Sequence, residues 1–469
     1  MRRVWPFPDS PPRQKADISS AKNFYPIERK EMSIKMELPQ NPYPSKLYVE
    51  TTTRCNLQCS MCVKQTEEAR IPEMDMQMDV FQKLEPALPH IDTLLLNGIG
   101  EPLLAKNLVE MIAHARKAIA PDAIISFQTN GMLLTSELAK QLVGAGLDRI
   151  CISVDMVNES GIFHGGEEIG RITHAFEYLR RASKETGRNV SIGVEFVLMR
   201  DNAASLPYSL QWAAEQGAKF ALVTHMLPYS DTMADQELFN PNTELSLAEY
   251  ERWKNEAQQR GLTLEKYHDI LWKVKKTERE VELVTFVHEH VKAALANGIP
   301  MHMPYLKQWT TEEKRAEQAW LATVFEKAQK VAEKYQMELT LPPITATHKR
   351  KCDFVEQGVA HITPTGDVRP CYSLWHEYSC VMDGDTKKIT PRTFGNILDS
   401  SIIEIWNSEE YRKFRKQVLE YEYPYCTNCS VAPCIDVTGH NDPFEMDCYG
   451  VTVPCGHCLW CMGGVRCLL

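Results

Sequence analysis

The chain has 469 residues, with 52 Lys+Arg against 62 Asp+Glu, a formal net charge of -10, 43% hydrophobic residues and 24% charged residues. This composition is typical of a globular protein with a full core, and it excludes a chain disordered throughout and a collagen-like fibre. The acidic balance argues against nucleic acid as a partner, because phosphate binding needs a basic surface. At about 100–200 residues per domain, we expect two or three domains.

Residues 1–44 are rich in proline and polar residues, and we interpret them as an N-terminal arm with little structure of its own. A regular alternation then begins. Apolar, β-branched runs predict strands at 47–53, 92–97, 123–129, 148–155, 190–198 and 219–224. Segments with helical spacing predict helices at 79–88, 107–119, 135–145, 171–186 and 203–216. Six strands alternating with helices predict an α/β fold with a parallel sheet, either open or closed into a full or partial barrel.

The residue pattern changes twice in the remainder of the chain. Residues 232–346 are charged and mainly helical, which predicts a helical insert that ends in a possible further strand, MELTLPP. From residue 352 onward, short strands, turns and cysteines predominate. GVAHITPTGDVRPC at 358–371 predicts a hairpin, and residues 394–418 predict a turn followed by an amphipathic helix. The predicted domains are therefore 1–44, 45–231, 232–346 and 347–469.

The 15 cysteines are unevenly distributed: Cys55, Cys59 and Cys62 form one group, and eight others lie between Cys426 and Cys467. The N-terminal MRRVWPFPDSPPRQK lacks the apolar stretch of a signal peptide, and no apolar run approaches the roughly 18 residues of a membrane span. We therefore expect a cytoplasmic protein with no membrane partner and with reduced cysteines. Clustered reduced cysteines are most often metal ligands.

The first cysteine group has the spacing C-x3-C-x2-C and directly follows the first predicted strand. Three thiolates on one loop can hold three irons of a [4Fe–4S] cube, which leaves the fourth iron open, as a catalytic metal site requires. Chemistry in a βα barrel collects on the loops at the carboxyl ends of the strands. A zinc site is the alternative, although zinc normally needs a fourth ligand.

With this loop the sequence resembles the radical S-adenosylmethionine (SAM) superfamily, whose signature is the same C-x3-C-x2-C. The resemblance implies a partial (β/α)6 TIM-like barrel in which Cys55, Cys59 and Cys62 hold a [4Fe–4S] cluster. Its open iron would bind SAM, and one electron would cleave SAM to a 5'-deoxyadenosyl radical that abstracts a hydrogen atom from substrate. Met61 departs from the aromatic residue that many members carry before the third cysteine.

Polar residues at the following strand ends extend the resemblance. The segment NGIGEP at 97–102 resembles the family's G-G-E-P motif, which contacts the SAM amino group. There Gly100 would allow close backbone approach, and the Glu101 carboxylate would suit an ammonium. Asn130, Ser153 and Asp155 follow the third and fourth strands at positions similar to those that meet SAM in the family. Ordinary turn or strand-end residues are the alternative interpretation.

Two further residues belong to predicted strands. His225 closes the sixth strand and is a candidate for the pocket, although a lone histidine is more often structural. Cys151 alternates with apolar neighbours in the fourth strand, and we expect it in the core.

The later cysteines resemble the SPASM extension of many radical SAM enzymes. Cys352, Gly366 and Cys371 have that family's spacing. The resemblance implies one or two auxiliary [4Fe–4S] clusters: Cys352 and Cys371 with a later cysteine such as Cys448, and Cys426, Cys429 and Cys434 with a residue such as Cys455. Cys458 is a further candidate ligand, whereas Cys380, Cys461 and Cys467 are not assigned. Structural zinc is the alternative, because C-x2-C pairs also suit zinc.

Tyr372 follows Cys371, where family members that oxidise protein side chains have an acidic residue. This departure puts a sulfatase-maturation activity in doubt and leaves Tyr372 as a candidate acid or base. The segments CNLQCSMC, HMLPYSDTM and PCGHCLW together resemble a narrower group of radical SAM/SPASM maturases, associated with tungsten-containing aldehyde oxidoreductases and related metalloenzymes.

The resemblance therefore predicts an enzyme, a radical SAM oxidoreductase or maturase that modifies a protein, a peptide or a metal cofactor. Its expected partners are that substrate and a low-potential electron donor such as ferredoxin or flavodoxin. Two alternatives stay open: a radical SAM enzyme of small-molecule biosynthesis, and a non-catalytic iron–sulfur or zinc protein.

Overall fold

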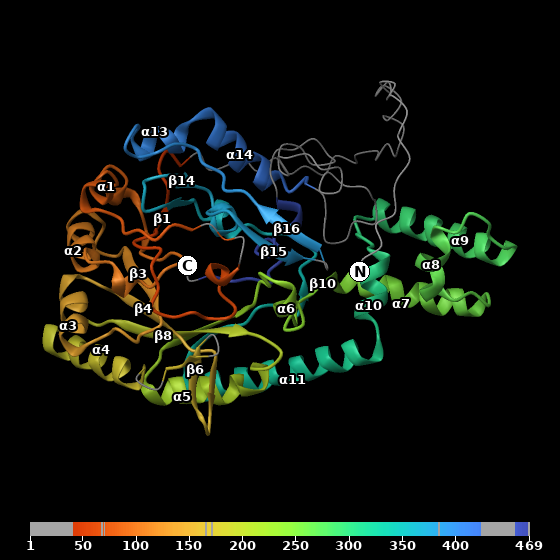
Figure 1. Ribbon diagram of the computed structural model, residues 1–469, viewed down its shortest axis with the longest axis horizontal. Helices are drawn as coiled ribbons and strands as arrows, with labels where there is room; N and C mark the ends of the chain where they lie inside the picture. The colour runs from red at the N-terminus through yellow and green to blue at the C-terminus, as the bar shows by residue number, and fades with distance from the viewer. Residues whose placement is uncertain are drawn as a thin grey trace, which may run out of the picture. The chain divides into compact units, whose positions relative to one another are not determined.

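The computed structural model describes residues 41–66, 69, 71–164, 167–169, 172–382, 385–423 and 455–467. Within these residues the fold is built on a nine-stranded sheet (Figure 1). The spatial order of its strands is β11-β9-β8-β4-β3-β2-β1-β13-β14. In chain order they are β1 (Lys46–Val49), β2 (Thr93–Leu95), β3 (Ile124–Thr129), β4 (Arg149–Ser153), β8 (Ser191–Leu198), β9 (Phe220–His225), β11 (Glu338–Thr340), β13 (Val359–Ile362) and β14 (Val368–Arg369).

The six predicted strands lie side by side in chain order, and every neighbouring pair among them is parallel. Leu47, Leu94 and Ile125 are in register on β1, β2 and β3 and are fully buried. Apolar runs mark these strands because a parallel sheet is covered on both faces. The predicted α/β class and partial (β/α)6 arrangement are confirmed. The sheet is open, with β11 and β14 at its edges.

Helices follow the strands and cover the outer side of the sheet (Figure 1). In α3, Thr135 Oγ1 accepts a hydrogen bond from Leu138 N, and Gly146 ends the helix with φ +120°. The helix predicted at 79–88 is shorter than expected, because Pro86 interrupts it. The helices are α1 (Met78–Gln82), α2 (Leu108–Ala118), α3 (Ser136–Ala145), α4 (Ile172–Thr186) and α5 (Leu206–Gln216).

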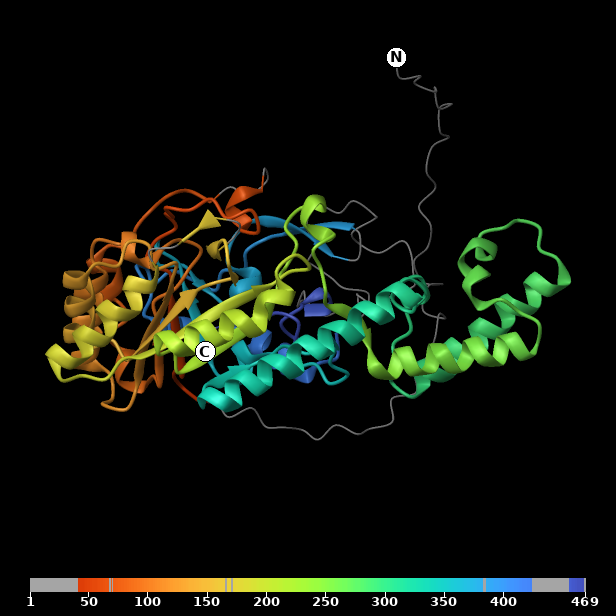
Figure 2. The ribbon, with the colours of Figure 1, turned by 90° about the horizontal axis from the view of Figure 1, so that it is seen from below.

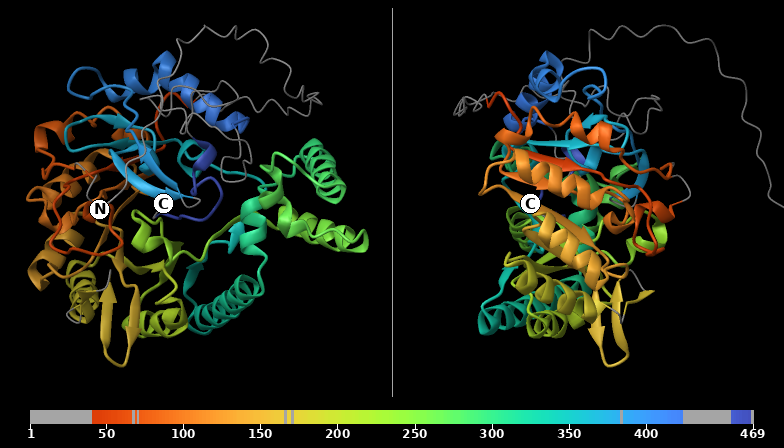
Figure 3. Two further views of the ribbon diagram at one scale, coloured as in Figure 1. Left: turned by 45° about the vertical axis from the view of Figure 1, so that its right-hand side comes forward. Right: turned by 90° about the vertical axis from the view of Figure 1, so that its left-hand side faces the viewer.

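A small antiparallel sheet between β4 and α4 was not predicted (Figure 3). Its strands have two to four residues, too few for a clear period. Asn158 Oδ1 accepts a hydrogen bond from Ser160 N at 2.8 Å in the first turn. The strands are β5 (Met156–Asn158), β6 (Gly161–His164) and β7 (Glu167–Glu168). This sheet places His164 next to the end of β4.

Residues 232–346 are mainly helical, as expected, but they divide into two parts. The helices α7 to α10 pack around a core of their own that includes Trp253, Phe286 and Val287. In contrast, α11 packs against α5 (Figure 2), and β11, the further strand expected in MELTLPP, pairs with β9. The elements are α6 (Asp231–Ala234), β10 (Asn240–Thr243), α7 (Glu244–Gln259), α8 (Tyr267–Leu271), α9 (Glu278–Ala296), α10 (Met303–Trp309), α11 (Glu312–Tyr335), β11 and β12 (Thr345–Ala346).

The C-terminal region forms the predicted hairpin, with Gly366 at φ +87° in its turn. Its first strand, β13, also pairs in parallel with β1 and so extends the main sheet, which was not foreseen. The single helix expected after the hairpin is two helices, because Ser408 leaves the helical conformation and caps the second. The remaining elements are α12 (Asp353–Glu356), β15 (Tyr378–Met382), β16 (Asp385–Ile389), α13 (Ile402–Asn407) and α14 (Glu409–Glu420).

Among the described residues, no helix combines the length and the apolar character needed to cross a membrane.

Candidate active site and auxiliary cysteine site

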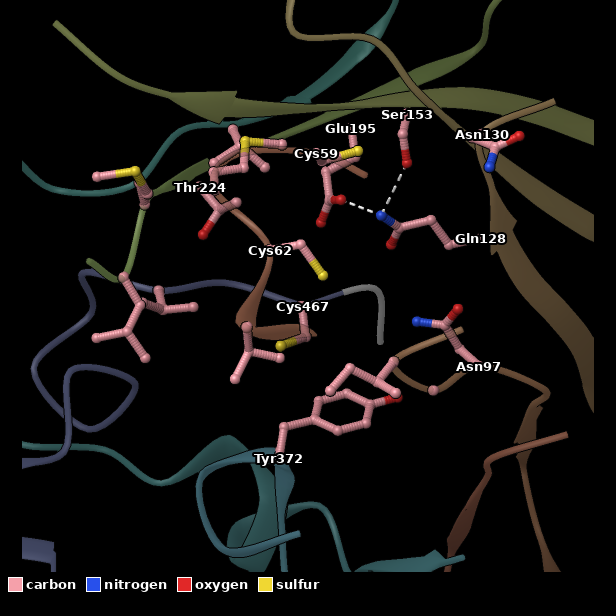
Figure 4. Close-up of a pocket in the computed structure, with 18 of the residues that line it drawn as sticks. Cys59, Cys62, Asn97, Gln128, Asn130, Ser153, Glu195, Thr224, Tyr372 and Cys467 are labelled. Carbon is pink, nitrogen blue, oxygen red and sulfur yellow. Dashed lines mark hydrogen bonds between the residues drawn. The ribbon is translucent and has the colours of Figure 1, made fainter. Parts of the chain in front are cut away.

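A cavity of about 300 Å³ lies at the carboxyl ends of the main-sheet strands (Figure 4). It is lined by residues from the first cysteine loop, by the ends of β2, β3, β4, β8 and β9, and by C-terminal residues. Most of the predicted site residues line it: Cys55, Cys59, Cys62, Gly100, Glu101, Asn130, Ser153, His225 and Tyr372. Asp155 is not among the lining residues.

The cysteine loop is held by its flanking residues. Arg54 donates two hydrogen bonds to the Asp75 carboxylate, at 2.9 and 2.6 Å, and a third to the Leu104 carbonyl at 2.7 Å. Within the loop, Cys62 N donates to the Cys59 carbonyl at 2.9 Å. The loop is therefore tied to the segments before α1 and after the NGIGEP motif.

The three thiols of this loop are free. Burial raises the pKa of both Cys55 and Cys62. Such thiols lose their protons when they bind a metal ion or cluster, because the cation compensates the thiolate charge. Three unpaired thiols on one loop at a cavity wall can hold three irons of a [4Fe–4S] cube.

Gly100 touches the base of this loop. A Cβ atom there would lie 2.5 Å from both the Arg54 and Thr52 carbonyl oxygens, so only glycine fits. The neighbouring Glu50 is fully buried and was not singled out from the sequence. Its carboxylate accepts a hydrogen bond from Ile99 N at 2.9 Å and contacts His376 Nε2 at 2.8 Å. Glu50 thus joins the NGIGEP segment to the C-terminal region.

Glu101 is buried and already has three donors. Its carboxylate accepts hydrogen bonds from Thr129 Oγ1 at 2.6 Å, Asn130 N at 2.8 Å and Leu103 N at 3.0 Å. Burial raises the pKa of Glu101. Glu101 therefore fixes the end of β3 against the NGIGEP segment, in addition to facing the cavity.

Asn130 and Ser153 line the cavity and have protein partners. Asn130 Nδ2 donates to Asn56 Oδ1 at 3.0 Å, which connects the end of β3 to the cysteine loop. Ser153 Oγ accepts from Gln128 Nε2 at 3.1 Å (Figure 4). Each of these side chains is therefore held in place before any ligand binds.

Asp155 faces other protein groups. One of its carboxylate oxygens accepts a hydrogen bond from Val197 N at 2.9 Å, and the other contacts His164 Nδ1 at 2.8 Å. Burial disfavours the charged form of His164, but the Asp155 carboxylate outweighs burial and raises the pKa of His164 well above its usual value. His164 itself lines the cavity.

Gln128 and Glu195 are site residues that sequence reasoning missed. Gln128 Nε2 donates to the Glu195 carboxylate as well as to Ser153, and both residues line the cavity (Figure 4). Burial, together with the nearby Asp155 charge, raises the pKa of Glu195 to about 7. A signal was present, because both are polar residues inside otherwise apolar predicted strands.

His225 is buried at the end of β9, and its Nε2 contacts the Pro343 carbonyl at 2.9 Å. Burial lowers the pKa of His225 to about 4, so the imidazole is neutral near pH 7. Cys151 on β4 is fully buried in the main core, as predicted.

The C-terminal tail, residues 455–467, contributes an unexpected wall of the cavity. Arg466 N donates to Thr224 Oγ1 at 2.8 Å, which fixes the tail to β9. Cys467 lines the cavity together with Cys59 and Cys62 (Figure 4). Its sulfur accepts a hydrogen bond from Trp460 Nε1 at 3.1 Å, and burial raises its pKa to about 12. The sequence did not place this thiol.

A second cavity gathers five cysteines: Cys352, Cys371, Cys455, Cys458 and Cys461. The expected partition put Cys455 with the other auxiliary group, and Cys461 had no assignment. The predicted ligands Cys426, Cys429, Cys434 and Cys448 lie outside the described residues. In the described ranges, no three His, Cys, Asp or Glu side chains come close enough together to hold a single metal ion. The thiols around a cubane each bind a different iron.

Tyr372 separates the two cavities. Its neighbour Cys371 lines the second cavity, whereas Tyr372 lines the first and faces Asn97 (Figure 4). Its ring packs against Tyr48 and Trp375, with centroids 5.4 and 4.7 Å apart. Burial raises the pKa of Tyr372 well above 10, so the phenol is neutral at physiological pH.

Comparison with known proteins identifies both regions. A family model for the Radical SAM superfamily matches residues 49–202, and the SPASM model, an iron–sulfur cluster-binding domain, matches residues 352–430. A solved structure of anSMEcpe with bound AdoMet is similar with a TM-score of 0.44 at 15% identity, covering 80% of each chain.

Two curated relatives differ in how much of the chain they cover. The tungsten-containing aldehyde ferredoxin oxidoreductase cofactor-modifying protein of Pyrococcus furiosus is 28% identical over 427 residues, which are 90% of this chain and 96% of that protein. The PqqA peptide cyclase of Granulibacter bethesdensis is 26% identical over 205 residues, 43% of this chain and 52% of that protein. The two model matches show that the chain contains a Radical SAM domain and a SPASM iron–sulfur cluster-binding domain.

Proposed function

We propose that this enzyme cleaves SAM reductively at a [4Fe–4S] cluster held by Cys55, Cys59 and Cys62, and that it thereby modifies a protein, a peptide or a metal cofactor. The Radical SAM domain implies the cluster and SAM, and the SPASM domain implies auxiliary iron–sulfur clusters. The observation that carries the proposal is the cavity in which the three free thiols of one loop meet the polar strand ends.

The residues present fit this cofactor pair. Three thiols face the cavity, and Gly100 leaves just enough room for the loop that carries them. When bound, the cluster supplies one electron for the reductive cleavage of SAM, which leads to hydrogen-atom abstraction from the substrate. The protein's part is to bind and orient SAM and to exclude water from the cavity.

The carboxylates of the cavity suit the cationic groups of SAM. A carboxylate oxygen can accept two hydrogen bonds, and Glu101 Oε2 accepts one from the described residues, so it can still receive an ammonium N–H. Glu195, which accepts from the same Gln128 Nε2 group as Ser153, is a second buried carboxylate. Buried carboxylates favour a positively charged ligand, because burial disfavours their negative charge.

Asn130, Ser153 and Asp155 have distinct proposed roles. Ser153 accepts a hydrogen bond from Gln128 and keeps its own O–H to donate toward SAM. Asn130 holds the end of β3 against the cysteine loop through Asn56. Asp155 acts indirectly, because it orients His164, which lines the cavity, and the Val197 backbone.

Similarity to named relatives supports a macromolecular substrate or cofactor. The cofactor-modifying protein is similar over almost the whole chain, and the peptide cyclase is similar over less than half of it. We therefore infer a maturase whose substrate is a protein, a peptide or a metal cofactor, with a tungsten-dependent oxidoreductase as the finer candidate. The electron would come from a low-potential donor such as ferredoxin or flavodoxin.

The test is formation of 5'-deoxyadenosine from SAM after anaerobic reconstitution with iron and sulfide and reduction with dithionite. The native chain is expected to form it, and Cys55→Ala is expected to abolish it. Cys380→Ala is the matched control, because Cys380 is a buried cysteine that lines neither cavity. The proposal fails if the native chain makes no 5'-deoxyadenosine, or if Cys55→Ala still makes it.

A further inference from the structure

Five thiols surround the second cavity, one more than a [4Fe–4S] cube can bind. Cys352 and Cys371 belong to the matched SPASM region at 352–430. The other three, Cys455, Cys458 and Cys461, come from the C-terminal tail, beyond that match. The tail therefore brings more thiols to this site than the matched domain does.

The spacing of the tail cysteines suits one cube. Cys455, Cys458 and Cys461 form a C-x2-C-x2-C run. In bacterial ferredoxins the same run supplies three ligands to one [4Fe–4S] cluster, and the fourth comes from elsewhere in the chain. A short 3-10 helix, Cys455–His457, begins the run, and Cys458 N donates to the Cys455 carbonyl at 3.2 Å.

Backbone contacts fix the tail next to the SPASM region. Lys351, which directly precedes Cys352 in the chain, donates through its backbone N to the Cys461 carbonyl at 2.9 Å. Thr347 N donates to the Met462 carbonyl at 3.0 Å. The Tyr423 hydroxyl donates to the Cys461 sulfur at 3.5 Å. Cys461 is thus held by a segment before the hairpin, through Lys351, and by a segment after it, through Tyr423.

The described side chains in the walls of this cavity carry no positive charge. Apart from the cysteines, the described residues that line it are Ser373 and apolar side chains such as Phe354, Leu374 and Phe414. No lysine or arginine is among those described residues. Several thiolates in apolar surroundings need a bound cationic metal or cluster.

We propose that the C-terminal tail completes an auxiliary [4Fe–4S] site beside Cys352 and Cys371, in which four of these five thiols bind one iron each, so that this cluster is held without Cys426, Cys429, Cys434 or Cys448. The inference rests on the proposed iron–sulfur function but does not depend on SAM cleavage. It departs from the expected partition, in which Cys455 served the other group.

The test uses the full chain with Cys55, Cys59 and Cys62 all replaced by alanine, so that the catalytic cluster does not contribute. After anaerobic reconstitution, iron and acid-labile sulfide are counted, and the reduced protein is examined by electron paramagnetic resonance (EPR). Adding Cys455→Ala, Cys458→Ala and Cys461→Ala is expected to remove about four irons per chain and one EPR signal. Replacing Cys426, Cys429, Cys434 and Cys448 by alanine is expected to leave that signal in place.

A control variant and an alternative variant distinguish loss of the cluster from loss of the fold. Cys380→Ala should change neither the iron count nor the spectrum. If the triple tail variant fails to fold, the single variant Cys458→Ser, which preserves size and changes the ligand atom, is expected to shift the g-values of the same signal. The inference is overturned if the folded tail variants keep an unchanged signal or if the site binds zinc. It is also overturned if the variant that lacks Cys426, Cys429, Cys434 and Cys448 loses the signal. Failure of SAM cleavage in the native chain would leave these readouts unaffected.

Discussion

At the scale of single residues, the site depends on close contacts that leave no room for change. Gly100 lies against two carbonyl oxygens of the cysteine loop, and Glu101 and Glu50 accept backbone hydrogen bonds that hold the same segment. These residues determine the positions of the three thiols. Small substitutions here should therefore disturb cofactor binding before they unfold the protein.

Gly100→Ala is expected to displace the cysteine loop, because the new Cβ would lie 2.5 Å from the Arg54 and Thr52 carbonyls. Overpacking of this kind costs about 1–3 kcal/mol of unfolding free energy. The thermal unfolding temperature and the iron content after reconstitution should both fall. Gly144→Ala is the control, since its Cβ would meet only the Thr186 methyl at 3.8 Å. That variant should be stabilised slightly; equal iron content in both variants would contradict the argument.

Glu195 gives a prediction about pH. Its pKa rises from an ordinary value of 4.5 to about 7 on folding. Between these values the folded chain keeps a proton that the unfolded chain has released, so stability falls as pH rises through this window. The loss is complete above about pH 7 and amounts to about 3 kcal/mol.

Glu195→Gln should remove this part of the pH dependence, as measured by urea unfolding of the cluster-free protein at pH 5 and pH 8. Burial also raises the pKa of Glu237 to about 7, outside the cavity. Glu237→Gln should therefore flatten the same stability profile but leave SAM binding intact. An unchanged slope in Glu195→Gln would show that Glu195 does not carry a raised pKa.

At the scale of secondary structure, local patterns predicted what local interactions determine. The six parallel strands β1–β4, β8 and β9 and the helices α2 to α5 follow from buried apolar runs and helical periods. The cysteine loop and NGIGEP were recognisable because short motifs keep their spacing. The β5–β7 sheet was missed because its strands are too short to show a period. The pairing of β13 with β1 and the separation of α11 from α7–α10 depend on distant partners, which periodicity does not reveal. Glu50, Gln128 and Glu195 lie within predicted apolar strands, where only their polar character distinguishes them.

The helices α7 to α10 have their own core, so their stability should be separable from that of the main sheet. Trp253 is fully buried there and donates to Glu249 through its indole N–H at 3.0 Å. Trp253→Ala is expected to cost about 3–5 kcal/mol within this core. Limited proteolysis should then cut within residues 244–309, while 5'-deoxyadenosine formation persists.

Trp272→Ala is the matched control for that experiment, because Trp272 lies in the same helical region but is 71% exposed. It should leave the protease pattern unchanged. Loss of SAM cleavage in Trp253→Ala, with the main sheet still folded, would show that these helices take part in forming the active site.

At the scale of the whole molecule, the C-terminal region is part of the main fold. It extends the sheet through β13, and its tail is fixed to β9 by Arg466 and to the segment before Cys352 by Cys461. As a result, adjacent residues line different cavities: Tyr372 and Trp460 face the first, whereas Cys371 and Cys461 face the second. An auxiliary cluster in the second cavity would therefore be held by residues whose sequence neighbours line the first cavity.

The most direct test of the central claim asks whether SAM binds the cluster of the Cys55 loop. Cysteines 352, 371, 426, 429, 434, 448, 455, 458 and 461 are replaced by alanine, and the reconstituted, reduced chain is examined by EPR with and without SAM. An open iron held by Cys55, Cys59 and Cys62 predicts one cluster signal, and SAM should shift its g-values. A spectrum that SAM leaves unchanged, or a folded chain that holds zinc in place of iron, would contradict the account.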